Sequence, residues 1–452
     1  MEATTRTRPR NGEQLDLSVD SLAFGGAGVA RLDGYVVFVS GALPGDRVRA
    51  EVVKSKRAFA QARTLEVLEP GPDRIEPLAP GHPGASWQVL RYERQLEVKH
   101  SQVDEALRRI GGLDGFLVEP IVPAQEQWRY RNKVEYSFGL DDDGQLVCGF
   151  HAQGRFDRIE PIADDMLASE AVNALRRRVV EWCRAEGLSA YDRRAHDGLL
   201  RNLVVREGRR TGELHARLVT SPGDLRTDAL AETAGAASFA WTRTESMGET
   251  TAGGVTELVS GEPTIEEELC GLRFRISPEA FFQTNTEMAE QLYGVAGEYA
   301  GLTGFERVFD LYCGIGTVGL TLAPRAAELW GVEIVEEAVA DAIATARLNE
   351  IDNARFFAGD VRLALPELLE KAGRPDLVVV DPPRAGLSKK AVRRVIDAAP
   401  KRIVYVSCNP TTLAPNAAQL AEAGWALRRV RPVDMFPQTP HIECVALLER
   451  ET

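Results

Sequence analysis

Cysteine and histidine are both scarce in this sequence and widely scattered. The six cysteines include no C-x-x-C pair, and the six histidines form no cluster with them. Structural zinc sites, iron–sulfur clusters and disulfide frameworks all need cysteines at close, regular spacing. We therefore expect six free thiols and no resident metal ion, so that each cysteine is either a small core residue or a nucleophile.

Long apolar runs are also absent. No stretch reaches the roughly 18 apolar residues that cross a bilayer, and the first residues, MEATTRTRPRNGEQ, lack the apolar segment of a secretory signal. Internal repeats and low-complexity tracts are missing too. These features predict a globular, cytoplasmic protein with no membrane partner, and we expect a monomer.

Positive charge is in short supply overall. The chain has 54 lysines and arginines against 67 aspartates and glutamates, a net charge of −13, which disfavours nucleic-acid binding by the surface as a whole. One segment, residues 45–64, is an exception and is called the basic stretch below. It contains Arg47, Arg49, Lys54, Lys56, Arg57 and Arg63 against Asp46 and Glu51. The basic stretch is either a local nucleic-acid contact or a solvated charged face.

The 452 residues divide into four segments by their patterns. Short apolar runs broken by Gly-Gly, Asp-Gly and Pro-Gly turns predict a small β-barrel over residues 1–70. Residues 71–118 hold a linker rich in proline and glycine and one helix, part of which we expect to pack on the C-terminal segment. Residues 119–270 mix strands with one helix, an α+β pattern, and residues 271–452 alternate apolar strands with helices. The sequence thus predicts an α/β, Rossmann-like doubly wound domain that follows a barrel and an α+β domain.

The segment DLYCGIGTVGL, residues 310–320, follows an apolar strand and leads into a helix. Its Gly314, Gly316 and Gly319 form a G-x-G-x-x-G pattern, which lets the backbone turn tightly and approach a ligand closely. A plain strand-to-helix turn could use the same glycines, and the ligand could be a dinucleotide or S-adenosylmethionine. Asp310 favours S-adenosylmethionine, because a carboxylate there would repel a pyrophosphate but suits a sulfonium and an amino group.

Acidic residues end two further strands of this segment. Glu333 ends ELWGVE and can accept hydrogen bonds from ribose hydroxyl groups, and Asp360 follows ARFFAG and can meet the adenine amino group. Ligands of doubly wound sheets bind at the carboxyl ends of the strands. We therefore expect both carboxylates beside the glycine-rich loop.

Three more candidates lie at the ends of later strands. In VVVDPPRAGL two prolines fix a rigid loop that directs the Asp381 carboxylate toward the same edge, although a loop without a functional role could have the same sequence. Cys408 ends RIVYVSC and precedes Asn409 and Pro410, so an exposed, positioned thiol is favoured over a packed one. Glu443 enters the apolar strand IECVAL, where burial would raise its pKa toward that of a general base; a cross-strand ion pair is the alternative.

Five ordered segments resemble the RNA (uracil-5-)-methyltransferase family: ISPEAFFQTNTEMAEQLY, DLYCGIGT, DPPRAGL, YVSCNPTTL and DMFPQTPHIE. The N-terminal barrel resembles the TRAM domain of that family, and WRYRNKVEYSFG and GLLRNLVVREG resemble its central RNA-binding domain. The resemblance covers nearly the whole chain. It implies an S-adenosylmethionine-dependent enzyme that methylates carbon 5 of a uridine in tRNA or rRNA.

The family's mechanism, carried over by matching motifs, implies a role for each candidate. Cys408 would add to carbon 6 of uracil, Glu443 would remove the proton from carbon 5, and Asp381 would hydrogen-bond the uracil edge. Phe281 would lie near the target base, and a substrate contact is implied at position 132, which is Asn132. Residues that match contacts to the methyl donor are Gln283, Tyr312, Thr317, Glu333, Asp360 and Asp381, together with Asp310, Gly314 and Gly316.

The chain departs from the family in two places. Many members carry four cysteines for an iron–sulfur cluster, three around the segment that matches LAPGHPGASWQ and one near IADDML; none is present here, so we expect no cluster. After SCNPTTLA the family usually continues with Arg-Asp, whereas this chain has Pro415 and Asn416. The second departure bears on how Cys408 is supported.

Three other functions fit parts of the pattern. An amino-group methyltransferase acting on a purine or glutamine would use the Asp-Pro-Pro motif but would not need Cys408, and Arg384 stands where such enzymes have an aromatic residue. An RNA-binding or RNA-folding protein with a vestigial methyl-donor pocket would bind RNA without turnover. A nicotinamide-dependent oxidoreductase has no use for the pair of Cys408 and Glu443.

Overall fold

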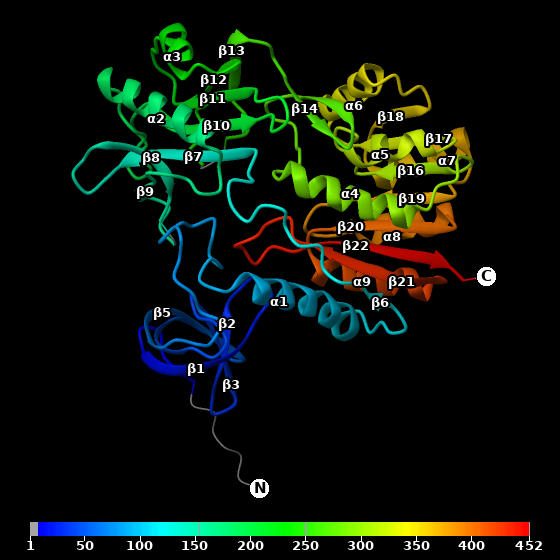
Figure 1. Cartoon of the computed structure of the whole chain (residues 1–452), viewed down its shortest axis with the longest axis horizontal. Coiled ribbons are helices and arrows are strands. Elements are labelled where there is room, and N and C mark those ends of the chain that lie inside the picture. Colours follow the sequence, from blue (N-terminus) through cyan, green and yellow to red (C-terminus); the bar gives the residue numbers. More distant parts are fainter. Residues whose placement is uncertain (1–7, 153, 249–250, 452) are drawn as a thin grey trace. The chain divides into compact units, whose positions relative to one another are not determined.

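The computed structural model describes residues 8–152, 154–248 and 251–451, and it divides into two compact units. One unit comprises the chain up to Ala106 together with Phe436–Ile442, and the other comprises Leu107–Met435 and the chain from Glu443 onward. The first seven residues of the polar N-terminal stretch lie outside the described residues. Figure 1 shows the elements of both units in sequence colours. Among the described residues, no helix has both the length and the apolar character that crossing a membrane requires.

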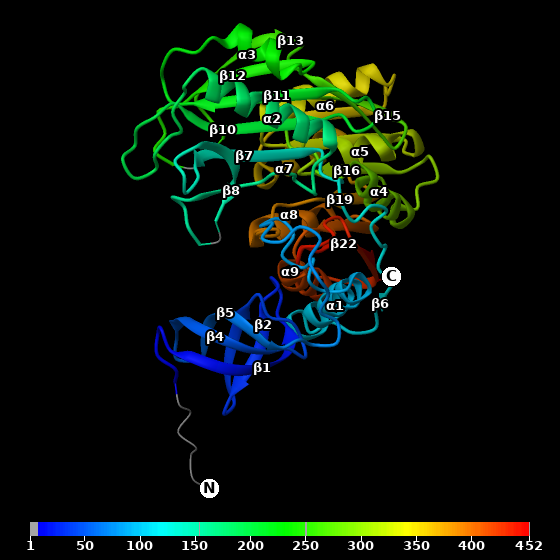
Figure 2. The ribbon, with the colours of Figure 1, turned by 60° about the vertical axis from the view of Figure 1, so that its left-hand side comes forward.

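The N-terminal unit is built on a closed barrel of five strands, drawn in blue in Figure 2. The strands are β1 (Gln14–Leu22), β2 (Gly28–Leu32), β3 (Tyr35–Ser40), β4 (Arg47–Ser55) and β5 (Phe59–Glu69). They follow one another around the barrel in the order β1-β2-β3-β5-β4, with β3 and β5 parallel and the other neighbours antiparallel. Small and β-branched side chains such as Val37, Val48 and Ala60 fill its interior, which confirms the predicted barrel.

Helix α1 (Tyr92–Glu105) of the same unit holds the returning segment Phe436–Ile442. The side-chain nitrogen of Gln95 donates to the side-chain oxygen of Gln438 at 2.8 Å, and the backbone N–H of Gln438 donates back to Gln95 Oε1 at 2.9 Å. Lys99 Nζ donates to the carbonyl oxygen of Phe436 at 3.0 Å. These hydrogen bonds order the segment that immediately precedes Glu443 in the chain.

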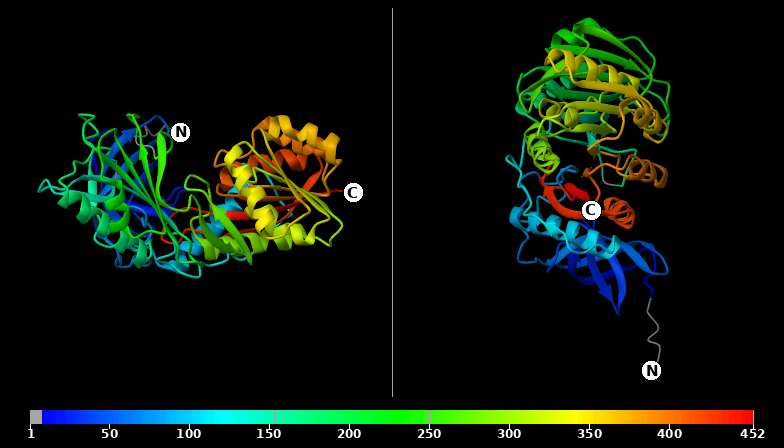
Figure 3. Two further views of the ribbon diagram at one scale, coloured as in Figure 1. Left: turned by 90° about the horizontal axis from the view of Figure 1, so that it is seen from above. Right: turned by 90° about the vertical axis from the view of Figure 1, so that its right-hand side faces the viewer.

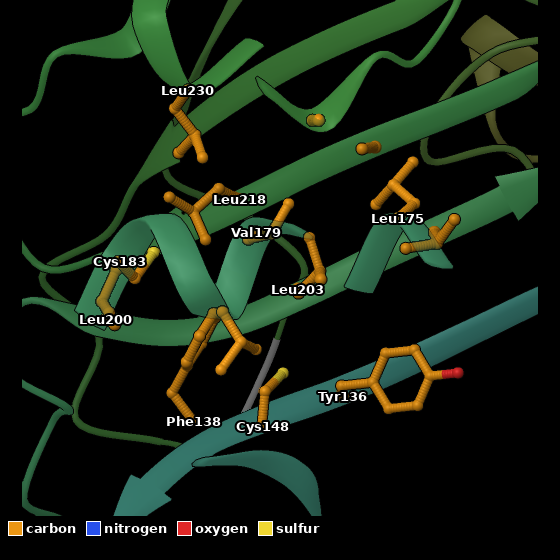
Figure 4. Packing of buried hydrophobic residues seen from close by; sticks show 14 of the residues in the cluster. Tyr136, Phe138, Cys148, Leu175, Val179, Cys183, Leu200, Leu203, Leu218 and Leu230 are labelled. Carbon is orange, nitrogen blue, oxygen red and sulfur yellow. The ribbon is translucent and has the colours of Figure 1, made fainter. Parts of the chain in front are cut away.

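The larger unit contains a seven-stranded sheet with helices on one face. The strands, in their order across the sheet, are β13 (Val255–Gly261), β12 (Ser238–Arg243), β11 (Leu214–Thr220), β10 (Leu200–Glu207), β7 (Lys133–Leu140), β8 (Leu146–His151) and β9 (Ile159–Pro161). Helices α2 (Glu170–Ala185) and α3 (Thr227–Ala234) pack on this sheet. Figure 4 shows Leu175, Val179 and Cys183 of α2 directed at leucine side chains of the strands.

The same unit also contains an eight-stranded sheet. The strands, again in spatial order, are β18 (Ala354–Ala358), β17 (Glu328–Glu333), β16 (Arg307–Leu311), β19 (Leu377–Val380), β20 (Arg402–Ser407), β22 (Glu443–Arg450), β21 (Trp425–Val433) and β6 (Leu117–Val118). The first five are the apolar strands expected from the sequence and run parallel, whereas β22 is antiparallel to both of its neighbours.

Helices follow the parallel strands and lie on both sides of this sheet, as Figure 3 shows for the yellow-to-red part of the chain. They are α5 (Thr317–Leu322), α6 (Glu336–Leu348), α7 (Val361–Ala372), α8 (Lys389–Ala398) and α9 (Pro410–Glu422). A hairpin of β14 (Ile265–Leu269) and β15 (Leu272–Ile276) and helix α4 (Thr286–Ala300) precede β16. The predicted doubly wound domain is confirmed. The finer division at residues 70, 118 and 270 stays a prediction.

Candidate active site

The candidate residues gather where neighbouring strands of the eight-stranded sheet end. Asp310 lies near the end of β16, Glu333 ends β17, Asp381 directly follows β19 and Cys408 directly follows β20. Because these four parallel strands are adjacent, their carboxyl ends form one edge. Ligands of doubly wound sheets bind at this edge, so the expected methyl-donor and catalytic residues share one region.

The glycine-rich loop after β16 is shaped by tight backbone contacts. Gly314 and Gly316 have positive φ angles of 54° and 81°, and the backbone N–H of Gly314 donates to Glu333 Oε2 at 3.1 Å. A Cβ on Gly319 would lie 2.5 Å from Asp310 Oδ2, and that oxygen instead accepts a hydrogen bond from the backbone N–H of Gly319 at 2.9 Å. Glycine is needed at position 319 so that the start of α5 can approach the buried carboxylate.

Asp310 is a buried carboxyl group with an unused oxygen. Its Oδ2 bonds to Gly319, but its Oδ1 has no hydrogen-bond partner among the described residues. Burial, together with the charges of Asp381 and Glu333, raises the pKa of Asp310 to about 8. A buried carboxyl of this kind fits a ligand that brings N–H donors or a positive charge, as the amino and sulfonium groups of S-adenosylmethionine do.

Glu333 and Asp360 are engaged to different degrees. Glu333 Oε1 accepts from the backbone N–H groups of residues 334 and 335 at 2.7 and 3.0 Å, which fixes the carboxylate but leaves lone pairs for a further donor. Asp360 is the N-cap of α7 and forms an ion pair with Arg362, which lowers the pKa of Asp360 to about 2. The contact expected between Asp360 and adenine would therefore share this carboxylate with Arg362.

Three other expected methyl-donor contacts lie on the loops around this edge. Tyr312 follows β16 with a positive φ of 64°, and its backbone N–H donates to the carbonyl oxygen of Val332 at 2.9 Å. Thr317 is the first residue of α5, and its hydroxyl shares a hydrogen bond of 3.0 Å with the hydroxyl of Tyr293. Gln283 lies between β15 and α4 and is buried.

Strand pairing sets Cys408 beside Glu443. β20 and β22 are antiparallel with Ser407 opposite Cys444, so the register, continued by one residue, puts Cys408 opposite Glu443. Glu443 is 4% exposed and Cys408 is half-buried. The expected catalytic pair therefore comes from two strands that are adjacent in space.

Burial and mutual repulsion keep protons on this pair. Burial raises the pKa of the Cys408 thiol to about 11, with the charges of Glu443 and Asp381 acting in the same direction and Arg384 opposing them. Burial also raises the pKa of Glu443 well above its ordinary value, again with Asp381 adding to the shift. Asp381, whose pKa burial raises to about 7, completes a group of three acids that compete for ionisation.

Two asparagines, Asn409 and Asn416, hold the loop that carries Cys408. Asn409 caps α9, its Oδ1 accepting from the backbone N–H of Thr411 at 3.0 Å, while its Nδ2 donates to the carbonyl oxygen of Arg384 at 3.1 Å. Asn416 Oδ1 accepts from the backbone N–H of Leu387 at 2.8 Å and from the hydroxyl of Tyr405 at 2.9 Å. The Asn416 Nδ2 donates to the Leu387 carbonyl oxygen at 3.0 Å. Asn416 thus ties together α9, β20 and the loop after Asp381, at the position where the family usually has aspartate.

The two expected substrate contacts differ in exposure. Phe281 is 69% exposed, as a residue that meets a base needs to be. Asn132 is 2% exposed, and its Nδ2 donates to the carbonyl oxygen of Gln283 at 2.8 Å and to Thr286 Oγ1 at 2.9 Å. Asn132 therefore holds the segment before α4 in place, and the expected substrate contact at position 132 stays a prediction.

Glu267 of β14 completes this support and was not singled out from the sequence. It is fully buried, and its carboxylate accepts from the Thr286 hydroxyl at 2.9 Å and from the backbone N–H groups of Arg209 and Arg210 at 2.8 and 3.0 Å. The turn after β10, the hairpin and the start of α4 are therefore joined through one carboxylate. An isolated glutamate in a strand gives no sequence signal for such a role.

The basic stretch of the barrel is partly neutralised. Arg47 pairs with Glu69 at 2.6 Å, Arg49 pairs with Asp16 at 3.0 Å, and Arg63 pairs with Glu51 at 2.6 Å. The remaining basic side chains are exposed and form no ion pair within the described residues: Lys54, Lys56 and Arg57. Any nucleic-acid contact of the barrel is therefore expected to rely on these three.

The cysteines are free thiols, as expected from their spacing. In the part of the chain that the structure describes, no group of three or more histidine, cysteine or acidic side chains could hold a metal ion.

The N-terminal and C-terminal parts of the chain each match a known protein family. Residues 264–451 match the family model described as tRNA (uracil-5-)-methyltransferase, and residues 8–65 match the TRAM domain. An uncharacterized RNA methyltransferase of Halalkalibacterium halodurans is 39% identical over 444 residues, which cover 96% of each chain. An uncharacterized RNA methyltransferase of Gloeobacter violaceus is 40% identical over 452 residues, which cover 97% of each chain.

A solved structure matches nearly the whole chain. It is the Pyrococcus abyssi tRNA (uracil-54, C5)-methyltransferase in complex with S-adenosyl-L-homocysteine, with 29% identity and a TM-score of 0.80 over 96% of this chain and 100% of that one. The resemblance stated from the motifs is confirmed. On these relatives, the chain belongs to the RNA (uracil-5-)-methyltransferase family and is an enzyme of the methyltransferase class.

Proposed function

We propose that this protein methylates carbon 5 of a specific uridine in tRNA or rRNA, with S-adenosylmethionine as the methyl donor and a covalent bond between Cys408 and carbon 6 as the intermediate. The observation that carries the proposal is the register of β20 and β22, which sets a thiol beside a buried carboxyl group. Methylation of an amino group needs neither Cys408 nor Glu443. The pair therefore favours attack on a pyrimidine carbon over the rival reactions.

The strand-end carboxyl groups suit the methyl donor. The unused Oδ1 of Asp310 can accept from an amino group, and Glu333 retains lone pairs for ribose hydroxyl groups. S-adenosylmethionine, bound at this edge as the second substrate, supplies the methyl group. The S-adenosyl-L-homocysteine bound to the Pyrococcus abyssi enzyme, which is what S-adenosylmethionine becomes after giving up its methyl group, supports the same choice for this chain.

The chemistry follows from the weak nucleophilicity of uracil carbon 5. Once Cys408 has lost its proton to solvent, its sulfur bonds to carbon 6, and the electron pair of the carbon 5–carbon 6 double bond moves toward O4 as an enolate. Asp381, with its pKa near 7, can donate a hydrogen bond to that developing charge. Carbon 5 then accepts the methyl group. Glu443, which like Cys408 first has to lose its own proton to solvent, then removes the carbon 5 proton as a carboxylate. The double bond re-forms, and the Cys408 sulfur leaves as a thiolate.

The uridine has to leave its stack to reach the strand ends, because carbon 6 is inaccessible inside a helix. We propose that the exposed Phe281 contacts the extruded base and that the barrel and the segment 119–270 hold the flanking RNA. We further propose that the protein works as a cytoplasmic monomer without an iron–sulfur cluster. A single monomer peak in light scattering and a colourless purified protein are the expected results.

Trapping with 5-fluorouridine RNA tests the covalent intermediate. With fluorine in place of hydrogen, carbon 5 has no proton for the base to remove, so the enzyme cannot be released by elimination. The methylated adduct should therefore stay on the intact protein through a denaturing gel. The substrates are tRNA and rRNA transcripts, with and without 5-fluorouridine, and the control variant is Cys408→Ala. Absence of an adduct from the wild-type protein, or full turnover by Cys408→Ala, would falsify the proposed mechanism.

Mass mapping of 5-methyluridine decides between the two RNA classes. Total RNA from a deletion strain should lack the modification at one position of either tRNA or rRNA that the parent strain carries. If both classes keep all their 5-methyluridine, the assignment of the reaction is wrong.

A further inference from the structure

The seven-stranded sheet carries buried basic residues on the face opposite to α2 and α3. Along β10 and β11, residues of the apolar core such as Val205 and Ala216 alternate with Arg206, His215 and Arg217, so these three side chains project from the other face. Arg206 pairs directly with His215 across the two strands. Each of the three is 2% exposed. Two arginines buried side by side need anionic or polar partners.

The partners present do not satisfy these two guanidinium groups. Arg206 Nη2 donates to the carbonyl oxygen of Ala280 at 2.6 Å, but its Nε and Nη1 have no partner among the described residues. Arg217 Nη1 donates to Glu279 Oε1 at 2.7 Å, while its Nε likewise lacks a partner there. Burial lowers the pKa of Arg206 to about 10, and the charge of Arg217 acts in the same direction. Arg206 nevertheless stays charged at neutral pH. Among the described residues, three donor nitrogens of the two guanidinium groups, Arg206 Nε and Nη1 and Arg217 Nε, have no acceptor.

His215 adds no charge to this pair. The Ser238 hydroxyl donates to the carbonyl oxygen of Glu262 at 2.6 Å, so it accepts from His215 Nδ1 across the 2.9 Å between them. Burial and the two nearby guanidinium groups lower the pKa of His215 to about 4. The imidazole is therefore neutral at neutral pH. The positive charge at this place comes from Arg206 and Arg217 and from Lys133 of β7, which lies directly opposite Arg206 and bonds to Glu135.

The carboxylates that interact with the arginines differ in how firmly they are held. Glu135 of β7 bonds to Lys133 Nζ at 2.7 Å and to the Thr251 hydroxyl at 2.9 Å, so it is shared with another cation. Glu279 lies in the short turn between β15 and α4, and its side chain is 55% exposed. An exposed carboxylate on a buried guanidinium regains its hydration when it leaves, so another anion can replace it at small cost.

We propose that Arg206 and Arg217 form a binding site for one backbone phosphate of the RNA, and that Glu279 occupies this site in the free enzyme. A phosphodiester brings two charged non-bridging oxygens, which the planar guanidinium groups can bind through paired N–H donors, and it can use the donors that Glu279 and Ala280 leave idle. The turn that carries Glu279 leads directly into Phe281. Displacement of Glu279 by the phosphate therefore moves the turn next to the residue proposed to meet the target base. This inference rests on the proposed function, because RNA is the ligand.

The test compares RNA affinity and its salt dependence across four variants. The probes are unfractionated tRNA and unfractionated rRNA from a strain that lacks the enzyme, and the dissociation constant is measured by filter binding at several salt concentrations. Arg217→Gln should bind the substrate RNA about tenfold more weakly, with a log–log salt slope that is smaller by about one. Arg217→Lys, which keeps the charge, should lie between Arg217→Gln and the wild type.

Glu279→Gln should bind RNA about three- to tenfold more tightly than the wild type, because the competing carboxylate is gone while the arginines remain. The matched control is Arg226→Gln, whose partner Glu186 lies 2.9 Å away in an exposed pair beside α2 and α3, and it should leave affinity and slope unchanged. Glu279 is exposed, so its variant reports on the site even if Arg217→Gln does not fold. Thermal unfolding checks the fold of each variant.

Two results would overturn the phosphate site: Glu279→Gln binding no more tightly than the wild type, or a folded Arg217→Gln with the affinity and slope of Arg226→Gln. If those occur while 5-fluorouridine RNA is trapped normally, this inference falls and the proposed function stands. If the variants change RNA affinity as expected but no adduct ever forms on Cys408, the proposed reaction falls and the phosphate site stands.

Discussion

Replacing Asn416 with alanine should loosen the loop that presents Cys408. Its side chain makes three hydrogen bonds of 2.8–3.0 Å, to the backbone N–H and carbonyl oxygen of Leu387 and to the hydroxyl of Tyr405. All of these groups are buried, and alanine leaves each of them without that partner. A buried polar group left unpaired costs about 1–3 kcal/mol, and losses at one site do not add fully. We therefore expect the unfolding free energy of the larger unit to fall by about 3–5 kcal/mol.

Two comparison variants test whether the loss of stability comes from the hydrogen bonds of Asn416. Asn416→Asp keeps an acceptor for the Leu387 N–H and the Tyr405 hydroxyl but loses the donor to the Leu387 carbonyl oxygen, so we expect a loss of about 1–3 kcal/mol. Gln419→Ala removes only a local bond to the carbonyl oxygen of Pro415 on the same helix, and we expect a change within about 0.5 kcal/mol.

Stability and reactivity are measured separately. Urea unfolding followed by tryptophan fluorescence gives the free energies, and the rate of adduct formation with 5-fluorouridine RNA is measured below the unfolding transition. A misplaced nucleophile reacts about 10–100-fold more slowly, so Asn416→Ala should lose rate as well as stability, whereas Gln419→Ala should keep both. If Asn416→Ala matched Gln419→Ala in both measurements, the argument that Asn416 supports Cys408 would be refuted.

Three further predictions follow from the site and the barrel. In Glu443→Gln, Cys408 should still add to the uracil and carbon 5 should still take the methyl group, but product release should be about 10²–10⁴-fold slower. A methylated adduct should therefore accumulate on a denaturing gel even without fluorine; rapid turnover would exclude Glu443 as the base. Asp310 has a raised folded-state pKa, so its contribution to stability is complete below its unfolded value of about 3.8 and is lost as the pH rises through about 8. The advantage in unfolding free energy of Asp310→Asn over the wild type should therefore grow between pH 4 and pH 8 in urea titrations, and a constant difference would contradict the buried, unpaired carboxyl. Reversing the charges of Lys54, Lys56 and Arg57 should weaken RNA binding and flatten its salt dependence more than reversing the ion-paired Arg47, Arg49 and Arg63; equal effects would remove the barrel lysines from the RNA contact.

Local patterns in the sequence predict much of the fold. The five parallel strands are continuous apolar runs, and each of them is confirmed at the place where its run predicts it. The barrel and the glycine-rich loop could also be predicted from the sequence. Gly-Gly, Asp-Gly and G-x-G-x-x-G mark turns whose geometry depends only on residues close together in the chain. The proposed catalytic roles of Cys408 and Glu443 came from the resemblance of ordered motifs, since nothing local in either strand reveals the other.

The sequence by itself determined the order of strands and helices, the glycine turns and the motifs that name the family, since all of these depend on residues close together in the chain. Tertiary structure alone decided which side chains meet. It pairs Glu443 with Cys408, gives Asn416 three hydrogen bonds near Cys408, and turns Asn132 inward toward Gln283. It also pairs half of the basic stretch with carboxylates and buries Arg206 and Arg217 with donor nitrogens that find no acceptor among the described residues. The physical reason is that hydrogen bonding and desolvation act between groups that strand pairing and helix packing bring together. These groups lie far apart in the sequence, so no local pattern of residues predicts that they will meet.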